Sequence, residues 1–179
     1  CPSSPPTVSN RMTQLTRDDV VRLIADRQAR GMLDLYFKGA DLSGLDLSGL
    51  DLHNARLRQA KLHAADLHEA NLSGADLVEA DLSLCDLRKA DLYQANLTGA
   101  DLSGANLTFA HLAQANLTAA LVCEANLTFA DARRANFTLA DLGRSNLREA
   151  RLNSAVLDQA DLTGTKLQGA IMPDGSRHE

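Results

Sequence analysis

A repeat of five residues covers most of this chain, and few folds are compatible with it. The stretch Ala95–Thr108 reads ANLTGADLSGANLT, and the same pattern runs without a change of register from about Leu35 to Met172. When positions are numbered from Ala40, position 1 is usually alanine, position 2 aspartate or asparagine, and position 3 leucine, while positions 4 and 5 are mostly polar. A period of five matches neither an α-helix, with about 3.6 residues per turn, nor a long β-strand, with a period of about two.

The spacing of the apolar positions indicates a coil. Positions 1 and 3 lie two residues apart, so in extended chain they point to the same side, and position 2 points to the other side. Positions 4 and 5 must then turn the chain before the next alanine. A path that turns the same way at each repeat coils around an axis lined by alanine and leucine. Successive coils can form hydrogen bonds at a spacing of about 4.8 Å, so the pattern predicts a solenoid stabilised by stacking.

The repeats ADLSG, ANLTG and ADLVE resemble those of the pentapeptide-repeat proteins. The resemblance covers about three quarters of the chain. It implies an all-β solenoid, the right-handed quadrilateral β-helix, in which four pentapeptides form one coil and residues twenty apart stack. The ending GAIMPDGS is similar to the close of many cyanobacterial members of this family.

Three further segments are predicted around the repeat array of residues 35–172. Residues 1–14 are rich in proline and serine and are expected to form a flexible leader, and residues 173–179 form a short polar tail. Residues 15–34 are expected to hold an N-terminal capping helix, which we predict from about residue 17 to residue 30 and which can end in a left-handed turn at Gly31.

Capping signals place the start of this helix. Thr16 and Asp19 have the spacing of a capping box, and Leu15 is placed before the cap for a hydrophobic staple with Val20. We expect the apolar side of the helix to cover the first coil, with these residues turned inward: Val20, Leu23 and Ile24.

Composition limits the class of protein. Aromatic residues make up 3% of the chain and tryptophan is absent, so leucine and alanine must fill the interior. The formal net charge of −5 argues against direct nucleic-acid binding. No apolar run approaches the roughly 18 residues of a membrane span. We therefore expect a cytoplasmic protein; the alternative is an exported or lipid-anchored one, tethered through Cys1.

The three cysteines are odd in number and widely spaced, which indicates neither a disulfide framework nor a zinc site. Cys85 occupies position 1 and is expected to be a buried, reduced thiol. Cys123 occupies position 4 and is expected to be exposed.

The sequence contains no pattern typical of an enzyme. Aspartates recur at position 2, but we interpret them as corner residues that bond nearby backbone, rather than as paired carboxylates or a calcium site. A Ser-His-Asp arrangement, a glycine-rich phosphate loop and a CxxC motif are all absent. We predict no catalytic, cofactor or metal site. Four histidines fall on different faces or coils, without the convergence that a metal requires: His53, His63, His68 and His111.

Departures from the repeat indicate where a partner could bind. Phe109 and Phe129 both occupy position 5 and lie twenty residues apart, so they are predicted to stack. This pair has two interpretations: packing within the turns, or a small apolar patch for a partner protein. Other apolar residues at outward positions are Leu84, Leu121, Leu139 and Val156. A group of arginines near the C-terminal coils is either a solvated basic face or a site for an anionic partner: Arg133, Arg134, Arg144, Arg148 and Arg151.

These observations favour a non-enzymatic interaction scaffold that binds an unidentified protein through its faces or ends. One alternative comes from the resemblance, because some family members mimic DNA and bind DNA gyrase. Residues 40–119 carry 11 acidic and 5 basic residues, but residues 120–172 carry 6 of each, which suits a polyanion mimic poorly. Another alternative is an inert structural spacer. Because the tail after Met172 is short and polar, the C-terminal end is either thinly covered or buried against a partner, including a second copy in a homodimer.

Overall fold

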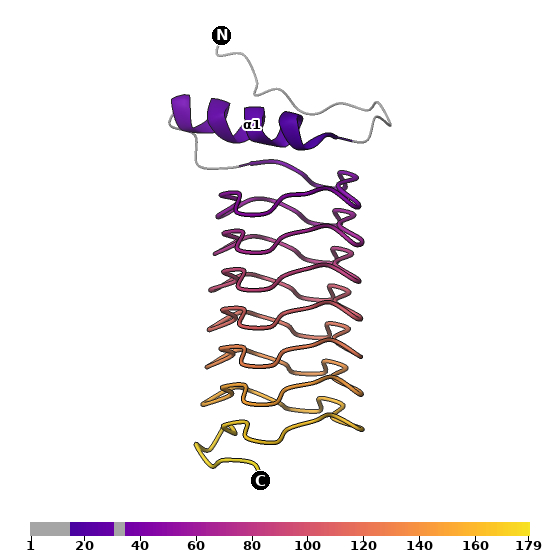
Figure 1. Cartoon of the computed structure of the whole chain (residues 1–179), viewed down its shortest axis with the longest axis vertical. Helices are drawn as coiled ribbons and strands as arrows, with labels where there is room; N and C mark the ends of the chain where they lie inside the picture. Colours follow the sequence, from indigo (N-terminus) through magenta and orange to yellow (C-terminus); the bar gives the residue numbers. More distant parts are fainter. Residues whose placement is uncertain (1–14, 31–34) are drawn as a thin grey trace.

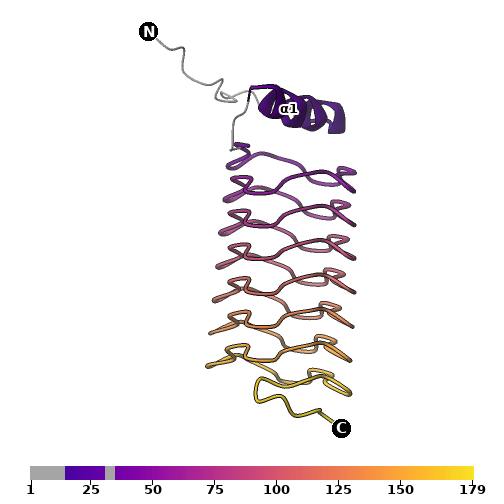
Figure 2. The ribbon, with the colours of Figure 1, turned by 90° about the vertical axis from the view of Figure 1, so that its left-hand side faces the viewer.

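The computed structural model describes residues 15–30 and 35–179 and consists of one helix and a stack of regular coils (Figure 1). Every parallel bridge joins a residue to the one twenty positions later, from Tyr36 with Arg56 to Arg151 with Ile171. Four pentapeptides therefore make one coil. The coils stack evenly along a single axis in both views (Figure 2).

The core of the stack is made of the residues at positions 1 and 3. Every position 3 residue from Leu42 to Leu152 is at most 1% exposed, including Phe137. Burying each leucine contributes roughly 1.5–3 kcal/mol, and alanine at position 1 leaves room for the leucines in a narrow tube. The prediction that both apolar positions face the axis is confirmed.

The coils are joined by a regular backbone ladder. The N–H of position 3 donates to the position 2 carbonyl of the next coil, as from Leu62 to Asp81 at 2.7 Å. The N–H of position 5 donates to the position 4 carbonyl of the next coil, as from Ala64 to Ser83 at 2.9 Å. The N–H of position 2 donates in the opposite direction, to the position 1 carbonyl of the preceding coil, as from Asp81 to Ala60 at 3.0 Å. The position 2 and position 4 carbonyls of each coil therefore need donors from the preceding coil.

Positions 4 and 5 form a tight turn at each corner. Position 5 has a positive φ throughout, and among the described residues nineteen of these positive-φ residues are not glycine. None of the nineteen is β-branched, although Val78 and Thr98 occupy position 4. The position 2 side chain accepts a hydrogen bond from the position 4 N–H, as between Asp41 and Ser43 at 3.1 Å. The predicted corner role of aspartate and asparagine is confirmed.

Helix α1 spans Arg17–Ala29, which agrees with the predicted start at residue 17 and ends one residue before the predicted end. The expected capping box is present: Thr16 accepts from the N–H of Asp19, whose carboxylate accepts from the N–H of Thr16 at 2.9 Å. Gly31, the predicted helix terminator, and the predicted leader lie outside the described residues. Within the described part of the chain, no helix is long and apolar enough to cross a bilayer.

α1 lies across the N-terminal end of the stack (Figures 1 and 2). Val20 is fully buried in the core, and Leu23 and Ile24 pack against it. Two arginines of the helix bond to corner carbonyls of the first coil.

Arg17 donates to the carbonyl oxygens of Asp46 and Ser48, the second at 3.4 Å. Arg27 donates to the carbonyl oxygen of His53 at 3.2 Å. Elsewhere in the stack such carbonyls accept from the preceding coil. Arg27 is 7% exposed and is the sole buried charged residue in the described segments.

The C-terminal end of the stack is less covered. The tail turns back on the last coil, where the N–H of Met172 donates to Ser176 at 2.7 Å and that of His178 to Ala170 at 2.8 Å. Three position 3 residues of this coil are only partly buried: Leu157, Leu162 and Leu167.

Candidate functional site

The repeat array carries an exposed pair of stacked phenylalanines. The rings of Phe109 and Phe129 are stacked with centroids 5.0 Å apart and planes 5° from parallel, as predicted from their spacing of twenty. Their exposed fractions are 56% and 48%, so the rings project from the turns rather than packing into them. The stacking of the pair is thus confirmed, and its rings form an exposed apolar feature.

Two of the predicted arginines flank Phe129 on the next coil. The N–H of Phe129 donates to the carbonyl of Arg148 at 3.0 Å, and the N–H of Arg151 donates to the carbonyl of Ala130 at 2.9 Å. Arg148 and Arg151 therefore lie on the two faces that meet at the Phe129 turn, and both are exposed. We call Phe109, Phe129, Arg148 and Arg151 the aromatic–basic surface.

The other predicted arginines do not join this surface. Arg133 is held by Asp131 at 2.6 Å, and Arg134 stands at the next corner of the coil. Arg144 pairs with Glu124 at 2.8 Å at a different corner again. The expected basic group is thus divided among several corners, because a step of five residues moves the chain to the next side of the coil.

A second aromatic contact was not anticipated from the sequence. The rings of Tyr93 and His111 stack with centroids 5.5 Å apart, and His111 follows Phe109 by two residues on the adjoining face. Position 4 of one coil meets position 2 of the next across a spacing of eighteen, as in the hydrogen bond from Asn116 to Thr98 at 3.0 Å. A search of the sequence at a spacing of eighteen as well as twenty would have found this pair.

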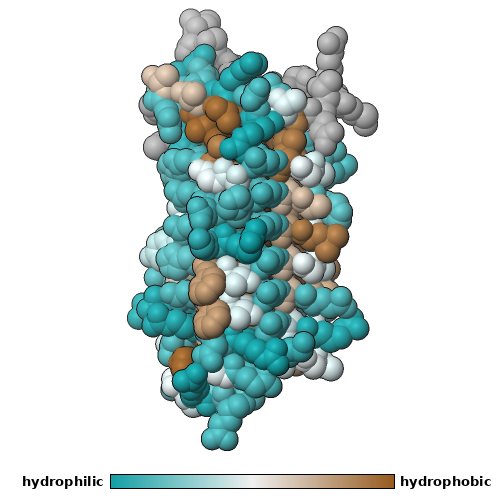
Figure 3. Space-filling model, in the orientation of Figure 1, coloured by the Kyte–Doolittle hydropathy of each residue, from teal (hydrophilic) through white to brown (hydrophobic). Residues whose placement is uncertain are grey.

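Other apolar residues at outward positions are scattered. Leu84, Leu121, Leu139 and Val156 are between 41% and 59% exposed, as expected from the repeat. They occupy different corners and faces, without a stacked partner of their own kind. In the space-filling view most of the visible surface is hydrophilic, and the hydrophobic residues form a few small groups and one narrow column along the stack (Figure 3).

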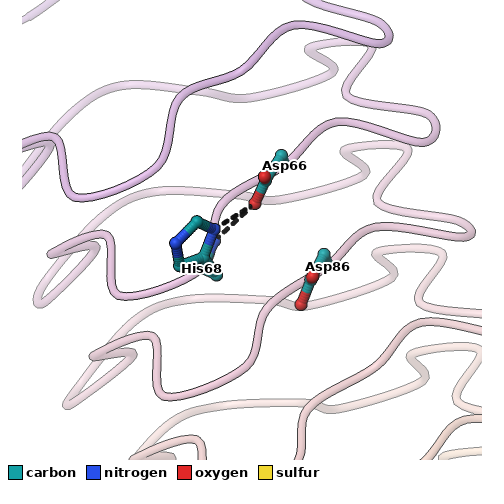
Figure 4. A group of neighbouring side chains, drawn as sticks. All are labelled: Asp66, His68 and Asp86. Atoms are coloured by element: carbon teal, nitrogen blue, oxygen red, sulfur yellow. Dashed lines mark hydrogen bonds and ion pairs between the residues drawn. The ribbon is translucent and has the colours of Figure 1, made fainter.

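One group of side chains has the proximity that a metal site requires. Ligand atoms of Asp66, His68 and Asp86 lie within 4.8 Å of one another (Figure 4). Each already has a protein partner, since Nδ1 of His68 lies 2.7 Å from Asp66 and Asp86 accepts from Nε of Arg88 at 2.8 Å. The hydrogen bond to Asp66 raises the pKa of His68, and the hydrogen bond from Arg88 lowers that of Asp86. These contacts explain the group as corner ion pairs.

The two described cysteines differ in environment. Cys85 is buried and free, its thiol donates to the carbonyl of Leu62 at 2.8 Å, and burial raises its pKa to about 12. Cys123, which was predicted to be exposed, is half-buried. Its sulfur lies 3.3 Å from the hydroxyl of Ser103, because a position 4 side chain rests against its neighbour in the adjacent coil.

Comparisons with known proteins agree with this architecture. The sequence profile of the pentapeptide repeats matches four overlapping segments, residues 36–74, 65–104, 100–138 and 135–172. A search of curated protein sequences found no match.

Three solved structures illustrate the similarity. HetL, a pentapeptide repeat protein involved in heterocyst differentiation regulation from the cyanobacterium Nostoc sp. strain PCC 7120, is 30% identical over 92% of this chain and 100% of its own, with a TM-score of 0.32. Rfr23 from the cyanobacterium Cyanothece 51142 is 22% identical over 82% of this chain and 94% of its own, with a TM-score of 0.46. Full-length QnrB1, a plasmid-mediated fluoroquinolone resistance protein, is 18% identical over 74% of this chain and 90% of its own, with a TM-score of 0.30.

The profile match spans nearly the whole coiled stack, from the first bridged residue, Tyr36, to Met172. Proteins of this kind fold as right-handed quadrilateral β-helices and are generally structural or interaction proteins rather than enzymes. The chain therefore belongs to the pentapeptide-repeat family.

Proposed function

We propose that this protein is a non-enzymatic scaffold that binds another protein through the aromatic–basic surface. The observation that carries the proposal is the stacked and exposed pair Phe109 and Phe129 on a largely polar surface. Apolar patches rimmed by polar residues are typical of interaction sites. Aromatic residues and arginine are also the residue types that most often dominate binding energy at interfaces.

Three purified baits test this proposal in a quantitative capture from native lysate. The wild type is compared with the double variant Phe109→Ala/Phe129→Ala and with the control Leu84→Ala/Leu139→Ala. The control also removes two exposed apolar side chains from position 5, but from other corners. We expect specific binders to be lost from the phenylalanine variant alone. Equal capture by all three baits would contradict the proposed surface, and capture by none would favour a spacer.

A second candidate function is a DNA mimic that binds DNA gyrase. It is favoured by the excess of acidic over basic residues at 40–119, which is 11 against 5. It is opposed by the equal numbers at 120–172, because a mimic needs a continuous acidic surface. Purified gyrase added to the same three baits tests it. Retention by the phenylalanine variant as well as the wild type would favour this candidate over the scaffold surface.

We also propose that α1 is the cap of the N-terminal end. The first coil has no preceding coil to supply N–H donors to its corner carbonyls. Arg17 and Arg27 supply guanidinium donors there instead, to Ser48 and His53 among others. Val20 adds a fully buried apolar side chain over the end of the core. One helix thus supplies hydrogen-bond donors to the carbonyls of the first coil and covers the apolar core at that end.

A homodimer through the C-terminal end remains a separate proposal. It is supported by Leu157, Leu162 and Leu167, which are only partly buried, whereas every earlier position 3 residue from Leu42 on is at most 1% exposed. Light scattering on the wild type and on Leu162→Glu tests it. A wild type of monomer mass at high concentration would refute it. The cytoplasmic location expected from the sequence also stays a prediction.

A further inference from the structure

We infer that the partner presents an acidic segment to the aromatic–basic surface. Its carboxylates bind Arg148 and Arg151 on either side of Phe129, and an apolar side chain between them covers the two rings. This inference rests on the proposed scaffold function and specifies the chemistry of the partner. The inference is based on the positions of Arg148 and Arg151 and on the salt bridges formed by the carboxylates beside them.

The two arginines are fixed by the backbone ladder on opposite sides of one corner. Arg148 precedes the turn, and its carbonyl accepts from the N–H of Phe129 at 3.0 Å. Arg151 follows the turn, and its carbonyl accepts from the N–H of Ala132 at 2.9 Å. Their side chains leave the coil on two adjoining faces. An extended segment that crosses the corner over Phe129 would pass both guanidinium groups.

Two carboxylates beside these arginines form salt bridges with other cations. Glu149 lies between the two arginines in the chain and is held by Arg177 at 2.9 Å. Asp131, which bridges to Arg151 through the backbone, is held by Arg133 at 2.6 Å.

Arg148 itself contacts a neutral group, Oε1 of Gln168, at 3.1 Å. Glu149 and Asp131 are therefore paired. Glu179 lines the same hollow as Gln168 and Arg177, so this corner holds four arginines and three acids, and its excess charge is positive. A guanidinium group pairs readily with a carboxylate in a bidentate arrangement.

The other side of the phenylalanine pair is electrically balanced. Lys89, which precedes Phe109 in the stack of position 5 residues, binds Glu69 at 2.9 Å. Arg88 beside it binds Asp86. The positive excess is therefore confined to the Phe129 side, and we expect the acidic part of the segment to lie there.

A short acidic peptide fits this surface better than a nucleic acid does. The chain carries a net charge of −5, and residues 40–119 hold most of the excess acid, so a long polyanion would be repelled along most of the rod. Each phenylalanine ring also has one face covered by the other, which reduces the area available for stacking bases.

Defined probes test the inference by fluorescence anisotropy with the full chain. The first probe is a terminally blocked, labelled hexapeptide with two glutamates on each side of a Leu-Phe pair. The second has glutamines in place of the glutamates, and the third is a thymidine oligonucleotide. We expect only the first to bind, and its binding to weaken as the salt concentration rises. Equal binding of the glutamine peptide, or stronger binding of the oligonucleotide, would overturn the inference.

Variants assign the effect to the surface. Arg148→Gln/Arg151→Gln should weaken binding of the acidic probe by about fivefold or more, as expected for two exposed ion pairs. The control Arg144→Gln removes an arginine paired with Glu124 at another corner and should leave binding unchanged. A control variant that weakens binding as much as the double variant would overturn the inference.

The lysate capture separates this inference from the proposed function. If binders are lost with Phe109→Ala/Phe129→Ala but retained by the double arginine variant, the scaffold stands and the acidic segment is wrong. If capture does not depend on the phenylalanines, the proposed function itself fails.

Discussion

The turn at position 5 should reject β-branched residues, and Gln114 is the place to measure the penalty. Its φ is 60°, its N–H donates to the carbonyl of Arg133 at 2.9 Å, and its side chain is exposed. Gln114→Val and Gln114→Leu both remove the side-chain hydrogen bond from Gln94. The two variants have similar apolar side chains, so their difference isolates branching at Cβ.

The expected difference follows from the backbone conformation. A left-handed conformation costs an ordinary residue roughly 1–2 kcal/mol, and it is a genuine outlier for a β-branched residue. Strained positions of this kind cost about 1–3 kcal/mol. We therefore expect Gln114→Val to be less stable than Gln114→Leu by about 1–2 kcal/mol, which lowers Tm by roughly 2–8 °C in a chain of this size.

Thermal unfolding followed by circular dichroism measures this difference. Asn153, at position 4, provides the matched control, because position 4 already accommodates Val78 and Thr98. Asn153→Val should be no less stable than Asn153→Leu. The reasoning is refuted if the two Gln114 variants unfold at the same temperature, or if valine is penalised equally at both positions.

Three further outcomes are expected. In a Cys1→Ser background, a thiol reagent should modify Cys123 but not Cys85 until the protein unfolds, because Cys85 is buried; equal rates on the native protein would contradict this burial. Arg27→Met should lower the free energy of unfolding by about 1–3 kcal/mol, because it leaves the carbonyl of His53 without its donor. The control Arg30→Met removes only an exposed i,i+4 ion pair and should change the free energy of unfolding by about 0.5 kcal/mol or less. Denaturant titrations measure both changes. Hydrogen bonds from Ser43 and Thr163 lower the pKa of Asp41 and Asp161 in the folded protein. The stability that these ionised aspartates contribute is therefore present above the ordinary aspartate pKa of about 4 and is lost as pH falls through the lowered pKa. Asp41→Asn/Asp161→Asn should flatten the fall of Tm below about pH 4, and an unchanged pH profile would contradict the assignment.

The fold was predictable because the period, rather than any single residue, determines it. Position 3 must be buried in every coil, so one outlier such as Phe137 does not disturb the register. The start of α1 was predictable for a local reason, since the capping box joins Thr16 and Asp19, which are only three residues apart. Stacking at a spacing of twenty then followed for Phe109 and Phe129.

The missed features depend on which side chain reaches which neighbour. Arg17 and Arg27 bond to carbonyls 26 to 31 residues away, and no pattern within the helix specifies that contact. Tyr93 and His111 are in contact because a position 4 side chain lies beside position 2 of the next coil. The repeat period of five does not by itself predict this direction of the side chain. The salt bridges that bind Glu149 to Arg177 and Asp131 to Arg133, rather than to Arg148 or Arg151, likewise depend on side-chain reach.

The phenylalanine pair is not required by the turns that carry it. Eight repeat turns of the described array have glycine at position 5, which adopts a positive φ without steric cost. Phe109 and Phe129 hold φ values of 60° and 59°, at a cost of roughly 1–2 kcal/mol each. Their stacking returns about 0.5–1.5 kcal/mol, which does not offset that cost. A side chain that the turn does not need, and that remains exposed after folding, is better explained by a contact outside the chain than by the fold.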